Sequence, residues 1–176
     1  MAYAASMGGH LIQLAPGASG GVDAIEPYLS RLRTAGFRAE PVELPKGTAE
    51  RALPVYRAAV RDSAAVIGGQ SFGGRVASLL AAEQPVAGLV LICYPLHPPG
   101  SPDRWEERTA HWPRLDVPVL LLSGDRDPFA RIELLRTAVK QLRRAELVVY
   151  PGVGHGLKAR ADDVATRVVD FVNSLD

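Results

Sequence analysis

The chain has one cysteine, no long apolar run and almost no excess of charge, and each of these shortages excludes a class of protein. Because Cys93 is alone, no internal disulfide can form and a structural zinc cluster is disfavoured. Lys and Arg total 20 against 19 Asp and Glu, which offers no electrostatic attraction for nucleic acid or an anionic membrane. No apolar run approaches the roughly 18 residues of a membrane span, and the amino terminus lacks a signal-peptide pattern. We therefore expect a cytoplasmic protein with a small-molecule substrate, and with neither nucleic acid nor membrane as partner.

Length and composition are those of one globular domain. The 176 residues fit the range of about 100–200 that single domains commonly span. With 47% apolar and 22% charged residues, the composition excludes disordered and fibrous classes. We expect residues 1–9 to form an amino-terminal tail, partly left over from recombinant expression, and residues 10–176 to form the domain.

Short apolar runs alternate with segments of helical periodicity. This alternation predicts an α/β fold, with a parallel sheet covered by helices on both faces. The predicted strands are residues 11–15, 37–44, 64–68, 87–93, 117–123 and 147–150. The predicted helices are residues 22–35, 49–62, 74–83, 131–143 and 162–175. The segment 95–102 holds four prolines and is predicted to be irregular. We expect about six mainly parallel strands.

A Gly-x-Ser-x-Gly motif runs from Gly69 to Gly73, directly after a predicted strand and before a predicted helix. A serine in such a sharp turn is held in a strained backbone conformation, and the two glycines let strand and helix pass closely. The helix start places N–H groups and its positive dipole end beside Ser71, where an oxyanion would form. The pentapeptide also occurs by chance in a chain with 17 glycines, so partner residues must support it. With its flanking elements, the motif predicts a nucleophile for acyl transfer.

A carboxylate and an imidazole follow two later strands. Asp125 and Asp127 come after the strand 117–123, and His155 stands among glycines after the last strand. Because ligands bind beyond the carboxyl ends of parallel strands, these groups and Ser71 are expected at one edge of the sheet. His155 would accept the Ser71 proton, and an aspartate would orient the imidazole. Alternatively, Asp125 caps its turn and Asp127 caps a helix that begins near Phe129.

The order serine, acid, histidine resembles the α/β-hydrolase superfamily. The likeness extends from about residue 11 to residue 175 and is most specific in segments 69–74, 94–100, 117–120, 124–129 and 154–155. Within the superfamily, the chain resembles small, minimally capped, dienelactone-hydrolase-like serine hydrolases, a group that also contains a testis-expressed mammalian protein and a subunit of a chromatin-acetylating complex. The resemblance implies the catalytic residues Ser71, Asp127 and His155, since Asp127 matches the acid of the family's Gly-x-x-Asp-Pro turn. Asp125 is the second choice.

The resemblance also implies an oxyanion hole and an open substrate pocket. The oxyanion hole would use the backbone N–H groups of Phe72 and Ala18. The chain departs from the family at Pro16, where relatives usually have a histidine that stiffens this loop, so we expect a less ordered loop. The candidate pocket residues are Gly17, Leu96, His97 and Phe129, with Phe72 and Trp105 also at its edge. His97 and His111 could line the pocket, but we expect both to face solvent.

These features together predict a serine hydrolase. We expect it to cleave small, largely uncharged esters or thioesters through an acyl-enzyme intermediate, with a preference for short acyl chains. No metal-ligand spacing and no nucleotide-binding glycine loop is present, so we expect no metal and no cofactor. The alternative is a non-catalytic interaction domain on the same fold, because a fold does not fix a function.

Overall fold

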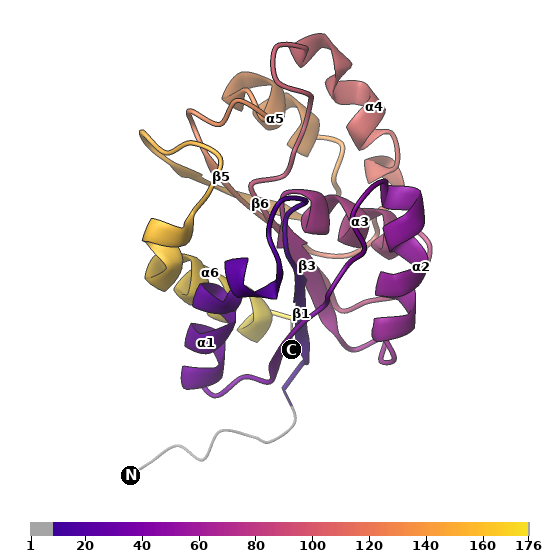
Figure 1. The fold of residues 1–176 in the computed structure, drawn as a ribbon, viewed down its shortest axis with the longest axis vertical. Coiled ribbons are helices and arrows are strands. Elements are labelled where there is room, and N and C mark those ends of the chain that lie inside the picture. Colours follow the sequence, from indigo (N-terminus) through magenta and orange to yellow (C-terminus); the bar gives the residue numbers. More distant parts are fainter. Residues whose placement is uncertain (1–8, 176) are drawn as a thin grey trace.

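The computed structural model describes residues 9–175, so nearly all of the predicted tail, residues 1–9, lies outside the described residues. Six parallel strands form one sheet in the order β2-β1-β3-β4-β5-β6 (Figure 1). Their bounds are β1 Ile12–Ala15, β2 Ala39–Pro41, β3 Val66–Gln70, β4 Gly88–Ile92, β5 Val119–Gly124 and β6 Ala145–Tyr150. The prediction of about six mainly parallel strands is confirmed.

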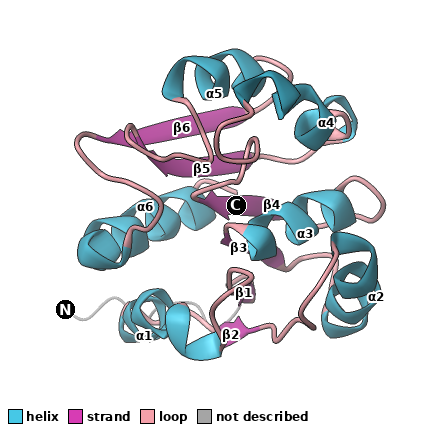
Figure 2. Cartoon of the chain, turned by 45° about the horizontal axis from the view of Figure 1, so that its top comes forward, coloured by secondary structure: helices cyan, strands magenta, loops and turns pink. Residues whose placement is uncertain are grey.

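Helices cover both faces of the sheet. The α-helices are α1 Glu26–Thr34, α2 Ala49–Ala59, α3 Phe72–Ala81, α4 Trp105–Thr109, α5 Ile132–Val139 and α6 Ala161–Asn173. Short 3-10 turns occupy η1 Val22–Ala24, η2 Pro102–Arg104, η3 Trp112–Arg114 and η4 Lys158–Arg160. Figure 2 shows the strands stacked from β6 to β2, with α1 and α6 on one side and α2 and α3 on the other. In the part of the chain that the structure describes, no helix combines the length and hydropathy needed to cross a bilayer.

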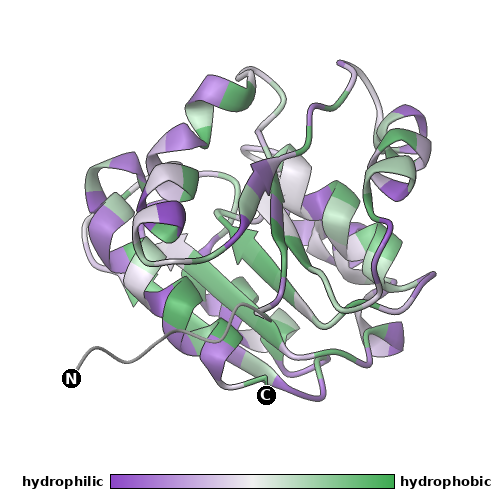
Figure 3. Ribbon diagram, turned by 90° about the horizontal axis from the view of Figure 1, so that it is seen from below, coloured by the Kyte–Doolittle hydropathy of each residue, from purple (hydrophilic) through white to green (hydrophobic). Residues whose placement is uncertain are grey.

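The strands contribute buried apolar residues to a core on each face of the sheet. Ile67, Leu89 and Leu121 belong to the apolar cluster beneath α2, α3 and α5. Their neighbours Val66 and Val90 belong to the cluster beneath α1 and α6. Figure 3 shows the resulting pattern, with hydrophobic strands inside and hydrophilic residues on the outer sides of the helices. Covering on both faces explains why the strands read as continuous apolar runs rather than alternating ones.

Two segments differ from the sequence prediction. The strand predicted at 37–44 is only the three-residue β2, an edge strand that contains Pro41, which has no N–H to donate. Between β4 and β5, the structure has the five-residue helix α4, which the sequence analysis missed. This segment is anchored by Trp112, which is fully buried and packs edge-on against Tyr94 with ring centroids 5.1 Å apart. As expected, residues 9–175 contain no large cap over the edge of the sheet.

Candidate active site

Ser71 lies in a strained turn between β3 and α3. Its backbone has φ 50° and ψ −115°, a left-handed conformation that costs a non-glycine residue about 1–3 kcal/mol and persists only where the surroundings impose it. Here its N–H donates to the Ile92 carbonyl at 2.8 Å, and its own carbonyl accepts from the Arg75 N–H at 3.0 Å. These bonds hold the serine at the carboxyl edge of the sheet.

Glycines make this turn possible because three backbone segments meet there. A Cβ on Gly69 would lie 2.4 Å from the Ala15 carbonyl oxygen, and one on Gly73 would lie 2.3 Å from the same atom. Both distances are too short for any side chain, so β1, β3 and α3 can approach this closely only with glycine at these positions. A Cβ on Gly17 would meet the Ser71 Cβ at 3.6 Å, which places the loop after β1 directly beside the serine.

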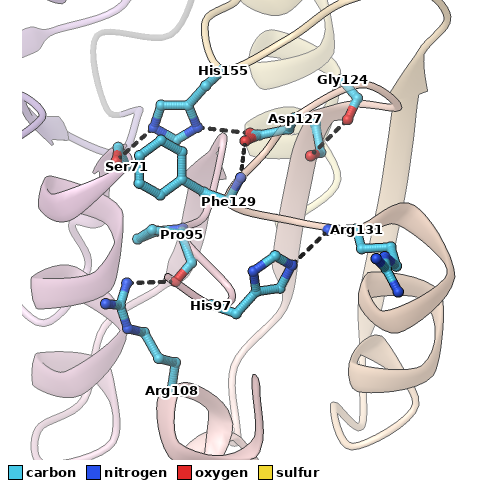
Figure 4. A network of polar contacts seen from close by, with 10 residues as sticks. Ser71, Pro95, His97, Arg108, Gly124, Asp127, Phe129, Arg131 and His155 are labelled. Atoms are coloured by element: carbon cyan, nitrogen blue, oxygen red, sulfur yellow. Dashed lines mark hydrogen bonds and ion pairs between the residues drawn. The ribbon is translucent and has the colours of Figure 1, made fainter. Parts of the chain in front are cut away.

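His155 joins Ser71 to Asp127 (Figure 4). Its Nε2 is 2.9 Å from the Ser71 Oγ, and its Nδ1 is 2.7 Å from the Asp127 Oδ2. The structure therefore brings together the three side chains that the sequence analysis preferred. Asp125 lies elsewhere, because its Oδ1 accepts a hydrogen bond from the Gly152 N–H at 2.7 Å, which caps the turn as the alternative interpretation suggested.

The surroundings of Asp127 determine which nitrogen of His155 carries the proton. The Asp127 side chain is fully buried, and its Oδ1 accepts from the Phe129 N–H at 2.8 Å. Since a carboxylate can only accept, the proton between the two side chains belongs to the His155 Nδ1. Nε2 then presents its lone pair to the Ser71 hydroxyl. The Phe129 ring packs on the imidazole with centroids 4.3 Å apart, which further limits its rotation.

Cys93 is the other nucleophilic side chain near this site. It is completely buried, and burial followed by the negative charge of Asp127 raises the pKa of its thiol to about 12. It is therefore protonated at neutral pH and is a poor nucleophile. Within residues 9–175, no three His, Cys, Asp or Glu side chains gather as a metal site requires. Because Cys93 is buried and protonated, Ser71 is the candidate nucleophile.

A cavity of about 400 Å³ opens beside Ser71, and both predicted oxyanion donors line it. Phe72 is the first residue of α3, so its N–H has no acceptor within the helix. Ala18 comes from the loop after β1. The two N–H groups border the same space as the serine, which suits the oxyanion role. That role stays a prediction.

The candidate pocket residues separate into two groups. Phe129 lines the Ser71 cavity, and Gly17 borders an adjoining one together with Ala18 and Phe72. Leu96 is completely buried, and Trp105 packs against the apolar cluster under α2, α3 and α5. These two residues do not line the cavity.

The expectation that His97 and His111 face solvent is wrong. His97 is 3% exposed, and its Nε2 accepts from the Arg131 N–H at 3.0 Å (Figure 4), which ties the segment after β4 to the start of α5. His111 is 6% exposed, with its Nε2 2.7 Å from the Ser78 Oγ. Burial, and then nearby arginine charge, lowers the pKa of His111 to about 4. Both histidines therefore hold loops in place, away from the Ser71 cavity.

The sequence analysis missed two arginines that line the cavity, Arg75 and Arg108. Arg75 follows Ser71 by four residues, and this helical spacing could have placed it on the same face as the serine. Arg108 comes from α4, and nothing local in the sequence indicates that this short helix reaches the site. Residues 47–50, around the start of α2, also line the cavity.

Comparison with known proteins agrees with this fold. The model of the family described as "Alpha/beta hydrolase domain" matches residues 25–173, so the chain belongs to this family. A non-heme haloperoxidase of Rhodococcus erythropolis is 39% identical over 62 residues, which are 34% of this chain and 23% of that protein. The chain thus spans about a quarter of the length of this curated relative.

Solved structures show the same fold. One, from work on the metagenome-derived lipolytic enzymes LipS and LipT, has a TM-score of 0.80 at 15% identity and covers 94% of this chain and 95% of its own. A monoacylglycerol lipase of Paleococcus ferrophilus has a TM-score of 0.79 at 14% identity, and the match covers 96% and 97% of the two chains. At such identities, the likeness establishes the architecture alone.

Proposed function

We propose that this chain is a serine hydrolase that cleaves small ester or thioester substrates through Ser71, His155 and Asp127. The observation that carries the proposal is the continuous contact from the Ser71 Oγ through the His155 imidazole to the buried Asp127 carboxylate, with distances of 2.9 and 2.7 Å. Assignment to the small, dienelactone-hydrolase-like members of the family is part of the same proposal.

In the acylation step, the Ser71 Oγ attacks the substrate carbonyl carbon while its proton passes to the His155 Nε2. The resulting oxyanion accepts hydrogen bonds from the Phe72 and Ala18 N–H groups. Asp127 stabilises the imidazolium through Nδ1. When the tetrahedral intermediate collapses, the leaving alcohol or thiol takes the proton from Nε2, and the acyl group remains on Ser71.

In the deacylation step, a water molecule gives a proton to the His155 Nε2 as its oxygen attacks the acyl carbonyl. The second tetrahedral intermediate expels the Ser71 Oγ, which recovers the proton from Nε2. The product is a carboxylic acid, and the protein returns to its starting state.

The cavity beside Ser71 is small for a ligand site. Its volume of about 400 Å³ is near the lower end of the roughly 300–1,000 Å³ that ligand sites commonly have. This supports a short acyl chain. The structural neighbours include a lipolytic enzyme and a monoacylglycerol lipase, which is consistent with ester cleavage.

Hydrolysis of p-nitrophenyl esters from acetate to octanoate tests the proposal. We expect the wild type to prefer the short chains and Ser71→Ala to lose more than about 10³-fold in kcat. Ser63→Ala is a matched control, because Ser63 is an exposed serine before β3, at the opposite edge of the sheet, and it should keep full activity. A folded Ser71→Ala protein as active as the wild type would refute the proposal. A folded wild type that hydrolyses none of the esters would favour the non-catalytic interaction domain.

A further inference from the structure

Two guanidinium groups lie on the walls of the Ser71 cavity. Arg75 comes from α3 and Arg108 from α4, and both are partly buried. Burial, followed by the positive charge of Arg75, lowers the pKa of Arg108. The two like charges are therefore close enough to repel each other. Such an arrangement is unfavourable in an empty site and becomes favourable when an anion lies between them.

Arg75 is placed beside the nucleophile by the geometry of its helix. Residues four apart lie on one helix face, and side chains lean toward the amino end of the helix, so the Arg75 guanidinium reaches toward the level of Ser71. Its Nε is buried and has no hydrogen-bond partner among residues 9–175. A buried donor without an acceptor costs free energy, and an anionic ligand would provide the acceptor.

Arg108 is held in place by its own contacts. Its Nη1 donates to the Pro95 carbonyl at 3.0 Å (Figure 4), and its carbonyl accepts from the Tyr94 hydroxyl at 2.6 Å. Tyr94 in turn packs against the buried Trp112. A guanidinium has five N–H donors, so the Pro95 contact leaves others for a ligand. The short helix α4 therefore presents a pre-positioned cation to the cavity.

One acidic side chain, Glu50, also lines this cavity, so its charge offsets one of the two arginines and the lining stays net positive. Its own backbone N–H and the Thr48 hydroxyl at the start of α2 lower the pKa of the Glu50 carboxyl most, and the positive charge of Arg75 lowers it further. Within the described part of the chain, no carboxylate forms an ion pair with Arg75 or Arg108. The arginines are thus available to a ligand.

We propose that the substrate of this hydrolase carries an anionic group, a carboxylate or a phosphate, that Arg75 and Arg108 bind while Ser71 attacks the ester carbonyl. This inference rests on the proposed function. It replaces the largely uncharged substrate expected from the sequence. Guanidinium groups suit the role because their planar fork binds carboxylate and phosphate oxygens in pairs.

Two esters that differ only in a terminal charge test this inference. The mono-p-nitrophenyl ester of adipate carries a terminal carboxylate, and p-nitrophenyl hexanoate has the same chain length without it. We expect the wild type to have the higher kcat/KM for the adipate ester. Arg75→Gln and Arg108→Gln should each lower the ratio of the two kcat/KM values by about 10- to 100-fold, as loss of a charge-assisted hydrogen bond implies.

Matched measurements separate a binding role from a structural one. Arg104→Gln is the control, because Arg104 pairs with Glu107 at an exposed position outside the cavity, and it should leave the ratio unchanged. Arg108→Lys should lose part of the preference, since it keeps the charge and loses the fork. Added salt should weaken turnover of the adipate ester more than that of the hexanoate ester, a test that needs no variant. A third ester with a terminal phosphonate shows which anion is preferred.

Equal kcat/KM values for the charged and neutral esters in the wild type, unaffected by the arginine substitutions, would overturn this inference and leave the proposed function standing. Equal ester turnover by wild type and Ser71→Ala would instead overturn the proposed function. In that case, calorimetric titration with free adipate decides the inference. Binding that Arg75→Gln and Arg108→Gln abolish would support an anion site, and absence of binding would refute it.

Discussion

Asp127→Asn tests whether His155 acts as a base, because it changes one buried acceptor into a donor with almost no change in shape. The carboxylate accepts from the Phe129 N–H at 2.8 Å and from the His155 Nδ1 at 2.7 Å. Asparagine has one oxygen and one NH₂ group. If the oxygen keeps the bond from Phe129, the NH₂ group faces Nδ1, which must then accept. The ring proton moves to Nε2, and His155 can no longer take the proton of Ser71.

The expected magnitude follows from the tautomer change. The same exchange in a serine-protease triad lowers kcat by about 10⁴-fold, and we expect a loss of about 10³- to 10⁴-fold here. This corresponds to about 4–5.5 kcal/mol of transition-state stabilisation. KM should change little, since Asp127 lies behind the imidazole and outside the substrate cavity.

Asp125→Asn is the matched control for this experiment. The Asp125 Oδ1 accepts from the Gly152 N–H at 2.7 Å, and asparagine keeps an oxygen for that bond. Steady-state hydrolysis of p-nitrophenyl acetate should therefore show wild-type rates for Asp125→Asn and a large loss for Asp127→Asn, with both melting temperatures recorded. If Asp127→Asn retained most of the wild-type kcat, or if Asp125→Asn lost as much, the reasoning about the His155 tautomer would be refuted.

Two further predictions concern stability. Gly73→Ala would place a methyl group 2.3 Å from the Ala15 carbonyl oxygen, and relieving this clash should cost about 1–3 kcal/mol, more than the helix propensity gained. Its Tm should fall, while Gly21→Ala, with no atom within 4 Å of the added carbon, should match the wild type; equal Tm values for both would contradict the close packing. His111 has a pKa of about 4 when folded and 6.5 otherwise, so the unfolded state binds its proton first as the pH falls. The neutral, buried His111 therefore contributes about 3 kcal/mol to the free energy of unfolding above pH 6.5, and this contribution is lost as the pH falls to 4. Urea unfolding of His111→Gln should show a shallower pH dependence in this window, and an unchanged slope would contradict the burial argument.

The sheet and the three central side chains of the site could be predicted because the signals are local. Each of Ser71, Asp127 and His155 follows an apolar strand, and parallel strands bring their carboxyl ends to one edge. The choice between Asp125 and Asp127 was different. Both follow β5 within three residues, so local patterns left the choice open, and the family resemblance favoured the residue that the structure places against His155.

The features that the sequence analysis missed depend on distant partners. The buried His111 contacts Ser78 of α3, and the buried His97 accepts from the backbone N–H of Arg131 before α5. Neither pairing leaves a mark in a short window of sequence. Helix α4 has five residues, too few to show helical periodicity, and it alone brings Arg108 to the Ser71 cavity.

Labelling with a fluorophosphonate, followed by mass spectrometry of the peptides, tests most directly whether the residue 71 hydroxyl is an activated nucleophile. We predict one adduct, on Ser71, formed quickly in the wild type, slowly in Asp127→Asn and not at all in Ser71→Ala. A folded wild-type protein in which Ser71 stays unmodified would contradict the assignment of nucleophile and base.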